Sequence, residues 1–317
     1  MWPLTLVAIA LILLHLTLIS WRLSMLFQPQ GLALPLKTSF RLTLIGLFFD
    51  IFLPGASGGP VAILFYATRE NSGRRTQVAT VVVFDRIVGL FSFLALPLIF
   101  APTFWPLVSR VHTLGVIVGT YAVIVTSLLG LLLLCLGRPS GVSHFADIVG
   151  YSSLRRFALR ALETVRAYRG HSKTLWAALG LSLLANLSMV GVIAVGLRIV
   201  NPASVVWRLC LIVPIGQIAN SLPITPGGLG VGEMAFNTLF KLSGLAGGAE
   251  AVLCWRVWAA LVSGLGLFYY VRGMERRIVT AVARSHDPSW AEADPEATRA
   301  PSQVPAECTT RKQSPFQ

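Results

Sequence analysis

The side chains best able to do chemistry in this chain are charged groups inside its apolar stretches. Asp85 and Arg86 are neighbours within one such stretch, Glu233 lies in a second, and Arg256 lies in a third. A charge at the centre of a membrane helix costs roughly 2.5–3.5 kcal/mol on insertion scales, so each of these groups needs a partner or a wet cavity. Arginine binds phosphate well and also pairs with carboxylates, so headgroup binding has to be weighed against structural pairing.

These charges allow two interpretations. In the structural one, Asp85 pairs with Arg86 and Glu233 with Arg256, or the arginines extend to the membrane surface. In the functional one, Arg86 and Arg256 line a cavity and meet phosphate groups from opposite leaflets. Asp50 precedes an interruption of the apolar pattern and is expected to cap or line it. The candidate headgroup-binding residues are therefore Arg86, Arg256, Glu233, Asp85 and Asp50, and no catalytic residue, metal or cofactor is expected.

The composition places these residues in membrane helices. Hydrophobic residues make up 55% of the 317 residues and charged residues 12%, whereas a soluble domain carries about 25% charged residues. No strand-like alternation occurs, so the expected fold is an all-α polytopic integral membrane protein. The net charge of +13 lies in loops, where it sets topology, and nucleic acid is not an expected partner. Apolar runs, most of them about 20 residues or longer and so able to cross a bilayer, occupy 2–20, 42–66, 78–101, 113–136, 174–197, 205–240 and 251–271.

Proline and glycine interrupt two of these runs, 42–66 and 205–240. Basic residues cluster before and after the first interrupted run, in the stretch 137–173, and just after the last apolar run. The positive-inside rule places all of these clusters in the cytoplasm. They share one side only if each interrupted run is a re-entrant hairpin of two half-helices, with the N-terminus outside and the C-terminus cytoplasmic. The expected hinge residues are Pro54, Gly55, Gly58 and Gly59 in the first hairpin and Pro223, Pro226, Gly227, Gly228 and Gly230 in the second.

The two interruptions also resemble each other. The pattern Leu-Pro-x-x-x-Gly-Gly occurs at 53–59 and again at 222–228, and the next apolar run carries Arg86 in one case and Arg256 in the other. An odd number of membrane crossings separates the two interruptions, so the second copy is inverted in the membrane relative to the first. The sequence therefore predicts an inverted-topology repeat, an architecture typical of proteins that expose a substrate alternately to two sides of a membrane.

The predicted organisation is one transmembrane domain over 1–284, with a basic amphipathic cytoplasmic connector at about 137–173. The polar tail at 285–317 is rich in proline, alanine and glutamate and is predicted to be disordered. The first apolar run has no basic residue before it and no A-x-A site after it, so we expect a retained helix and not a cleaved signal peptide.

At this point a family resemblance becomes visible. The segments FLPGASGG (52–59) and FDRIVGL (84–90), with VPIG (213–216) and LPITPGGLGVGE (222–233), resemble the signatures of the lysylphosphatidylglycerol synthase transmembrane-region family. This flippase-like group includes the membrane half of the multiple peptide resistance factor. The resemblance implies a bacterial or archaeal cell (inner) membrane and lipid translocation or a related envelope-lipid role. The chain departs from the family at Pro60, where Asp is usual, and at Ile63, where Arg or Lys is common.

The functional expectation is a flippase that moves a phospholipid or a lipid-linked envelope precursor, with an anionic headgroup, between leaflets. The alternative is a non-catalytic scaffold or accessory subunit that assists a partner enzyme of envelope lipid or glycan synthesis. An enzyme is not expected, because no nucleotide-binding or catalytic motif occurs and the cytoplasmic segments are too short to fold a catalytic domain.

Overall fold

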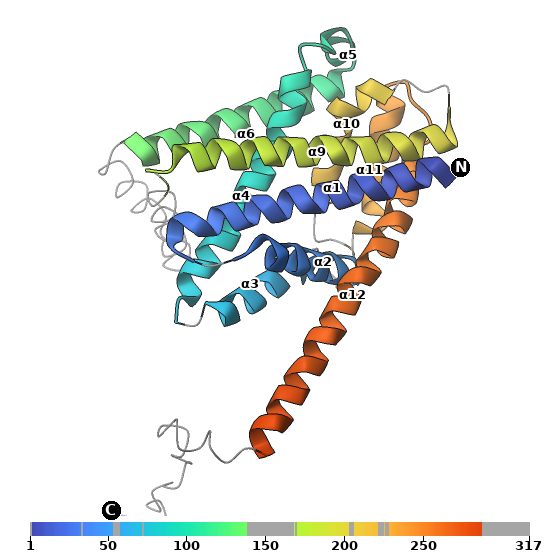
Figure 1. Cartoon of the computed structure of the whole chain (residues 1–317). Helices are drawn as coiled ribbons and strands as arrows, with labels where there is room; N and C mark the ends of the chain where they lie inside the picture. The colour runs from blue at the N-terminus through green and yellow to red at the C-terminus, as the bar shows by residue number, and fades with distance from the viewer. Residues whose placement is uncertain are drawn as a thin grey trace, which may run out of the picture. The chain divides into compact units, whose positions relative to one another are not determined.

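Five long apolar helices form the framework of this protein (Figure 1). The computed structural model describes residues 2–32, 34–52, 58–71, 73–137, 168, 170–202, 206–220, 225 and 228–286. Every regular element in these ranges is helical, which confirms the all-α prediction. The five helices are long and apolar enough to span a membrane and make this a multi-pass membrane protein: α1 (Trp2–Phe27), α4 (Arg75–Phe100), α6 (His112–Gly137), α9 (Ser172–Val200) and α12 (Gly248–His286).

Two pairs of shorter helices occupy the interrupted runs. In the first pair α2 (Leu36–Phe52) packs against α3 (Gly58–Glu70), and in the second α10 (Leu209–Asn220) packs against α11 (Val231–Leu242). Gly228 and Gly230 have φ angles of +71° and +84°, the left-handed region that glycine enters without strain. The other hinge residues begin α3 (Gly58, Gly59) or lie outside the described residues (Pro54, Gly55, Pro223, Pro226, Gly227).

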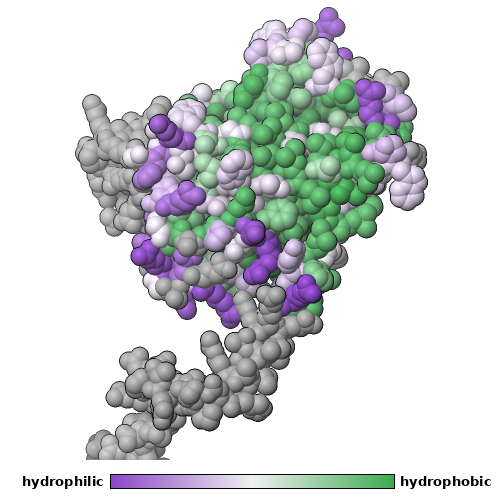
Figure 2. All heavy atoms as spheres, in the orientation of Figure 1, coloured by the Kyte–Doolittle hydropathy of each residue, from purple (hydrophilic) through white to green (hydrophobic). Residues whose placement is uncertain are grey.

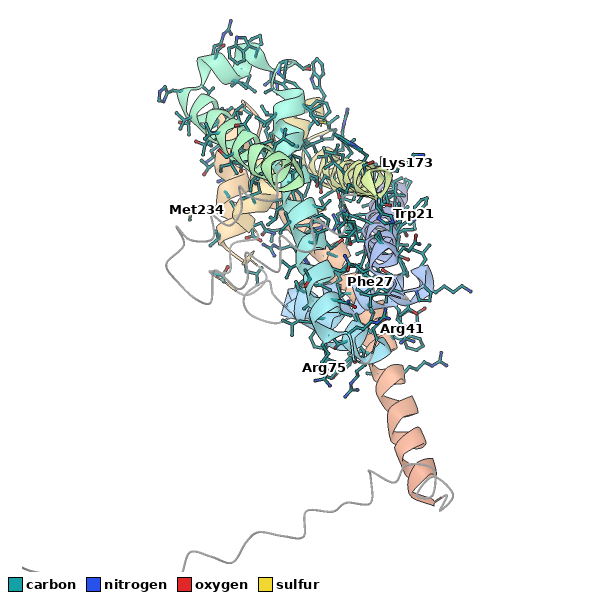
Figure 3. All side chains as sticks on the ribbon, turned by 90° about the vertical axis from the view of Figure 1, so that its left-hand side faces the viewer. Trp21, Phe27, Arg41, Arg75, Lys173 and Met234 are labelled. Atoms are coloured by element: carbon teal, nitrogen blue, oxygen red, sulfur yellow. The ribbon has the colours of Figure 1, made fainter. Side chains whose placement is uncertain are left out.

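In each helix pair, the chain segment before the first helix lies next to the segment after the second. Arg74, after α3, donates a hydrogen bond of 3.1 Å from Nη1 to the carbonyl oxygen of Gly31, before α2. Arg208, just before α10, donates one of 2.7 Å from Nη1 to the carbonyl oxygen of Ser243, just after α11. Figure 3 shows Arg41 and Arg75 near one end of the bundle. This closure is the geometry that a re-entrant hairpin requires, and its placement in a bilayer stays a prediction.

The repeat extends well beyond the two interruptions. The offset that superposes Gly58 on Gly228 also superposes Arg86 on Arg256. Under this same offset the bounds of α1 become 172–197, inside α9, and those of α3 become 228–240, which overlap α11. The helices α1–α4 and α9–α12 are therefore two copies of one unit. Between them lie α5 (Trp105–Arg110) and α6.

The equivalent helices α1 and α9 run antiparallel, side by side (Figure 1). Leu11 of α1 lies against Gly191 of α9, whereas Arg22 of α1 reaches Ser182. Residue numbers thus rise along one helix as they fall along the other. Opposite directions in equivalent helices confirm that the second copy is inverted relative to the first.

Close contacts through glycine bring the helices together. A Cβ at Gly266 of α12 would overlap the carbonyl oxygen of Leu44 in α2, and one at Gly196 of α9 would lie 2.8 Å from that of Ala251. Membrane helices associate through such close packing. Lipid tails are as apolar as the helix surfaces, so the hydrophobic effect does not drive the helices together. The face seen in Figure 2 carries a broad apolar area across its centre, with hydrophilic residues toward its margins.

The chain divides into a compact unit of residues 1–269 and a second unit from residue 270, whose described part, 270–286, is the end of α12. The predicted connector and tail lie almost wholly outside the described residues. Tyr168, a described residue of the connector, is buried, stacks on Phe84 with a centroid distance of 4.8 Å, and donates its hydroxyl hydrogen to the carbonyl oxygen of Leu26. Burial raises the pKa of Tyr168, and the carboxylate of Asp85 adds to the rise, so the hydroxyl remains a donor at neutral pH.

Candidate functional site

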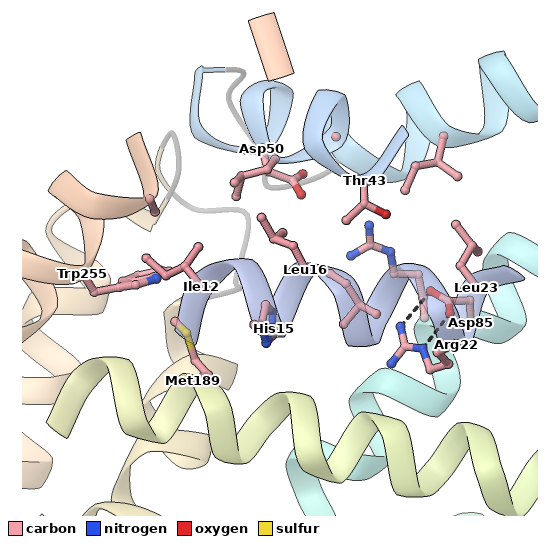
Figure 4. Close-up of a pocket in the computed structure, with 16 residues that line it drawn as sticks. Ile12, His15, Leu16, Arg22, Leu23, Thr43, Asp50, Asp85, Met189 and Trp255 are labelled. Carbon is pink, nitrogen blue, oxygen red and sulfur yellow. Dashed lines mark hydrogen bonds and ion pairs between the residues drawn. The ribbon is translucent and has the colours of Figure 1, made fainter. Parts of the chain in front are cut away.

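A cavity of about 210 Å³ lies among helices of both repeat copies (Figure 4). Residues of α1, α2, α3, α4, α9 and α12 line it, and most of them are apolar. Its polar lining comes from His15, Arg22, Thr43, Asp50, Asp85 and Arg86. Three of the five predicted site residues, Asp50, Asp85 and Arg86, therefore meet at one cavity.

Asp50 closes the first helix pair. Its Oδ1 accepts a hydrogen bond of 2.7 Å from the backbone nitrogen of Gly59, in the first turn of α3. A carboxylate is stabilised there by free amide groups and by the positive end of the helix dipole. A Cβ at Gly59 would overlap the carboxylate of Asp50, so the contact requires glycine. Asp50 thus caps the return helix, as expected, and also faces the cavity.

Asp85 pairs with Arg22 and not with Arg86. The two side chains form a bidentate pair, with Nε–Oδ1 of 2.7 Å and Nη2–Oδ2 of 2.8 Å, and Arg22 Nη1 donates to the Ser182 hydroxyl at 2.8 Å. The first apolar run was predicted to end at residue 20, before Arg22. The structure corrects this, because α1 continues to Phe27 and buries Arg22 to 7% exposure. The planar guanidinium matches a carboxylate in this geometry, so this charge pair is compensated.

Arg86 is exposed and lies at the cavity. Successive residues of a helix are turned by about 100°, so Arg86 cannot share the direction of Asp85. It forms no hydrogen bond or ion pair with any other described residue. Its five N–H donors are therefore available to an anion in the cavity.

Arg256, the equivalent arginine in the second copy, is fully engaged. Its Nε lies 2.6 Å from Oε1 of Glu233, and its Nη2 donates to Asn220 Oδ1 at 2.8 Å and to the carbonyl oxygen of Gly228 at 2.9 Å. Glu233 Oε2 in turn accepts from the backbone nitrogen of Gly230 at 2.7 Å. These contacts join the end of α10, the turn and the start of α11, which favours the structural interpretation of this pair. Direct headgroup contact by Arg256 and Glu233 stays a prediction.

One of the residue differences between the copies lies in the return helix beside these arginines. Under the offset that superposes Arg86 on Arg256, Ile63 occupies the position of Glu233 in the first copy. Arg86 therefore lacks the α3 carboxylate that would correspond to the partner of Arg256. With Ile63 where the second copy has Glu233, the first arginine stays open to a ligand.

His15 is a cavity residue absent from the sequence prediction. Its Nδ1 lies 2.8 Å from the carbonyl oxygen of Ala185 in α9. A further hydrogen bond of 2.8 Å joins Asn186 of α9 to Ser92 of α4. The sequence signal that could have identified His15 is its spacing of seven residues from Arg22, which places both side chains on one face of a helix.

Comparison with known proteins identifies the family of this chain. The family model described as the lysylphosphatidylglycerol synthase TM region matches residues 1–266, which include the first copy of the repeat, most of the second and every candidate site residue. The chain belongs to this family. No curated protein and no solved structure matches it. Membership of the lysylphosphatidylglycerol synthase TM-region family gives the chain a membrane-lipid-related function and an association with membrane lipids.

Proposed function

We propose that this protein moves a phospholipid or a lipid-linked envelope precursor between the leaflets of a bacterial or archaeal cell membrane. The observation that carries the proposal is the exposed guanidinium of Arg86 at a cavity, without a partner among the described residues. A phosphate headgroup supplies the negative charge and acceptor oxygens that this side chain lacks.

The inverted repeat supports movement between two sides. Related units of opposite orientation can exchange roles about a central site, and this exchange gives alternating access. The antiparallel packing of α1 on α9 is the interface about which the copies would move. In this proposal the N-terminus is outside and the C-terminus cytoplasmic.

The proposal involves no bond-making chemistry. The cavity offers an open arginine, a carboxylate and a histidine, and the lipid crosses unchanged. Differences in lipid concentration or gradients across the membrane supply the driving force for lipid movement.

Vesicles reconstituted with the purified protein and fluorescent phospholipids test the proposal. A membrane-impermeant reductant bleaches only outer-leaflet label, so bleaching beyond the outer fraction measures movement. We expect faster movement than in protein-free vesicles. Loss of one charged hydrogen bond costs about 1.5–3 kcal/mol, so Arg86→Ala should be roughly ten- to a hundredfold slower. Arg110→Ala, an exposed arginine on α5 away from the cavity lining, is the matched control.

Two results would decide against transport. If no phospholipid or polyprenyl carrier moves, the scaffold alternative gains support, with a partner enzyme of envelope lipid synthesis. If lipid moves equally fast in Arg86→Ala and Arg110→Ala, the assignment of Arg86 is wrong.

A further inference from the structure

The cavity presents two groups of opposite sign, Arg86 and Asp50, that form no ion pair with any described residue. Arg86 has no direct partner among the described residues, and Asp50 uses only Oδ1, in its bond from Gly59. Asp50 Oδ2 accepts no hydrogen bond from another described residue. The charge of Arg86 acts on Asp50, yet no hydrogen bond or ion pair joins the two side chains. Any occupant of the cavity therefore meets one cation and one carboxylate at separate points.

The second copy shows what these groups are missing. There, Asn220 occupies the position equivalent to Asp50 and accepts a hydrogen bond from Arg256, which Glu233 neutralises. In the first copy the aspartate turns to the return helix, and Ile63 stands at the α3 position equivalent to Glu233. An arginine and an aspartate that do not reach each other fit a ligand that carries both charges.

The other charged residues of the lining are already paired. A cavity of about 210 Å³ has room for several waters or for a small polar group. Arg22 and Asp85 neutralise one another at one side of the cavity, and His15 is bonded to α9. Asp50 and Thr43, both on α2, face α1 across this space (Figure 4). A phosphate with a short amine arm can place both of its charged groups within a cavity of this size.

We infer that the cargo is a phospholipid with a small zwitterionic headgroup of the phosphoethanolamine class. Its phosphate binds Arg86, and its ammonium group donates to Asp50 Oδ2. This inference rests on the proposed function and narrows it, because an anionic headgroup without an amine would leave Asp50 unpaired and repelled.

The test compares two fluorescent lipids with identical acyl chains in vesicles that contain the wild-type protein. We expect phosphatidylethanolamine to move about ten times faster than phosphatidylglycerol. In Asp50→Asn the amide oxygen still accepts from Gly59, so the cap is retained while the charge is lost. We expect this variant to slow phosphatidylethanolamine about tenfold and to speed phosphatidylglycerol, so that the preference disappears. An unfolding midpoint close to that of the wild type verifies that the variant folds.

A second series uses only the wild-type protein and therefore does not depend on a variant. Successive N-methylation of the headgroup removes the N–H donors, and we expect the rate to fall towards phosphatidylcholine. Equal wild-type rates for phosphatidylethanolamine and phosphatidylglycerol, or an unchanged preference in Asp50→Asn, would overturn the inference while leaving Arg86-dependent transport intact. Absence of movement for every lipid would instead overturn the proposed function itself.

Discussion

Replacement of Arg256 by alanine is expected to destabilise the second helix pair. Arg256 makes an ion pair with Glu233 and hydrogen bonds to Asn220 and Gly228, and both partners of the ion pair keep 16% of their side-chain surface exposed. Breaking a buried charge pair costs about 3–5 kcal/mol. Partial exposure and the remaining bond from Gly230 to Glu233 reduce this cost, so we expect a loss of about 2–3 kcal/mol in the free energy of unfolding.

Reversible unfolding in mixed micelles, with increasing denaturing detergent, measures this free energy. Arg110→Ala removes an arginine that makes no hydrogen bond or ion pair with another described residue, and it should change stability by less than about 0.5 kcal/mol. A double-mutant cycle of Arg256→Ala with Glu233→Ala isolates the pair, and we expect a coupling energy of about 1–3 kcal/mol. Equal stability of the Arg256 and Arg110 variants, or a coupling near zero, would refute the reasoning that this network holds the second pair together.

Three further changes test other parts of the structure. Arg22→Ala strips a buried carboxylate of its partner and should cost about 3–5 kcal/mol in the same unfolding assay; a loss below about 1 kcal/mol would contradict the pairing. Gly266→Ala places a Cβ against the α2 backbone and should cost about 1–3 kcal/mol, whereas Gly264→Ala enters open space and should be neutral or stabilising; equal effects would reject that close contact. Cysteines introduced for Lys37 and Arg75, in a protein without its four native cysteines, should react with an impermeant maleimide from the same membrane side, and labelling from opposite sides would exclude a re-entrant first pair.

Much of the fold could be predicted from local properties of the sequence. Apolar runs long enough to cross a bilayer predicted all five long helices, because backbone groups in lipid must be satisfied within the helix. Proline and glycine predicted both interruptions, since proline lacks a backbone donor and glycine tolerates positive φ. The repeat was visible as a short motif at 53–59 and 222–228. Its full extent became clear only from the helix bounds.

The site was harder to predict, because charge pairing depends on which helices touch. Sequence proximity suggested that Asp85 pairs with Arg86, but the partner is Arg22, on the distant helix α1. The proposed pair of Glu233 with Arg256 is present because both side chains lie at the same helix junction.

The sequence by itself determined the membrane class, the interruptions of the helices and the charged residues proposed to bind a headgroup, since each follows from the residue type and its immediate neighbours. Only the tertiary structure decided which of those charges remain open. Helix packing satisfies Arg22 and Arg256 through partners from distant segments and leaves Arg86 facing a cavity beside Asp50. A charge in a low-dielectric interior is compensated by whatever lies within a few ångströms, and that neighbourhood exists only after the helices have packed.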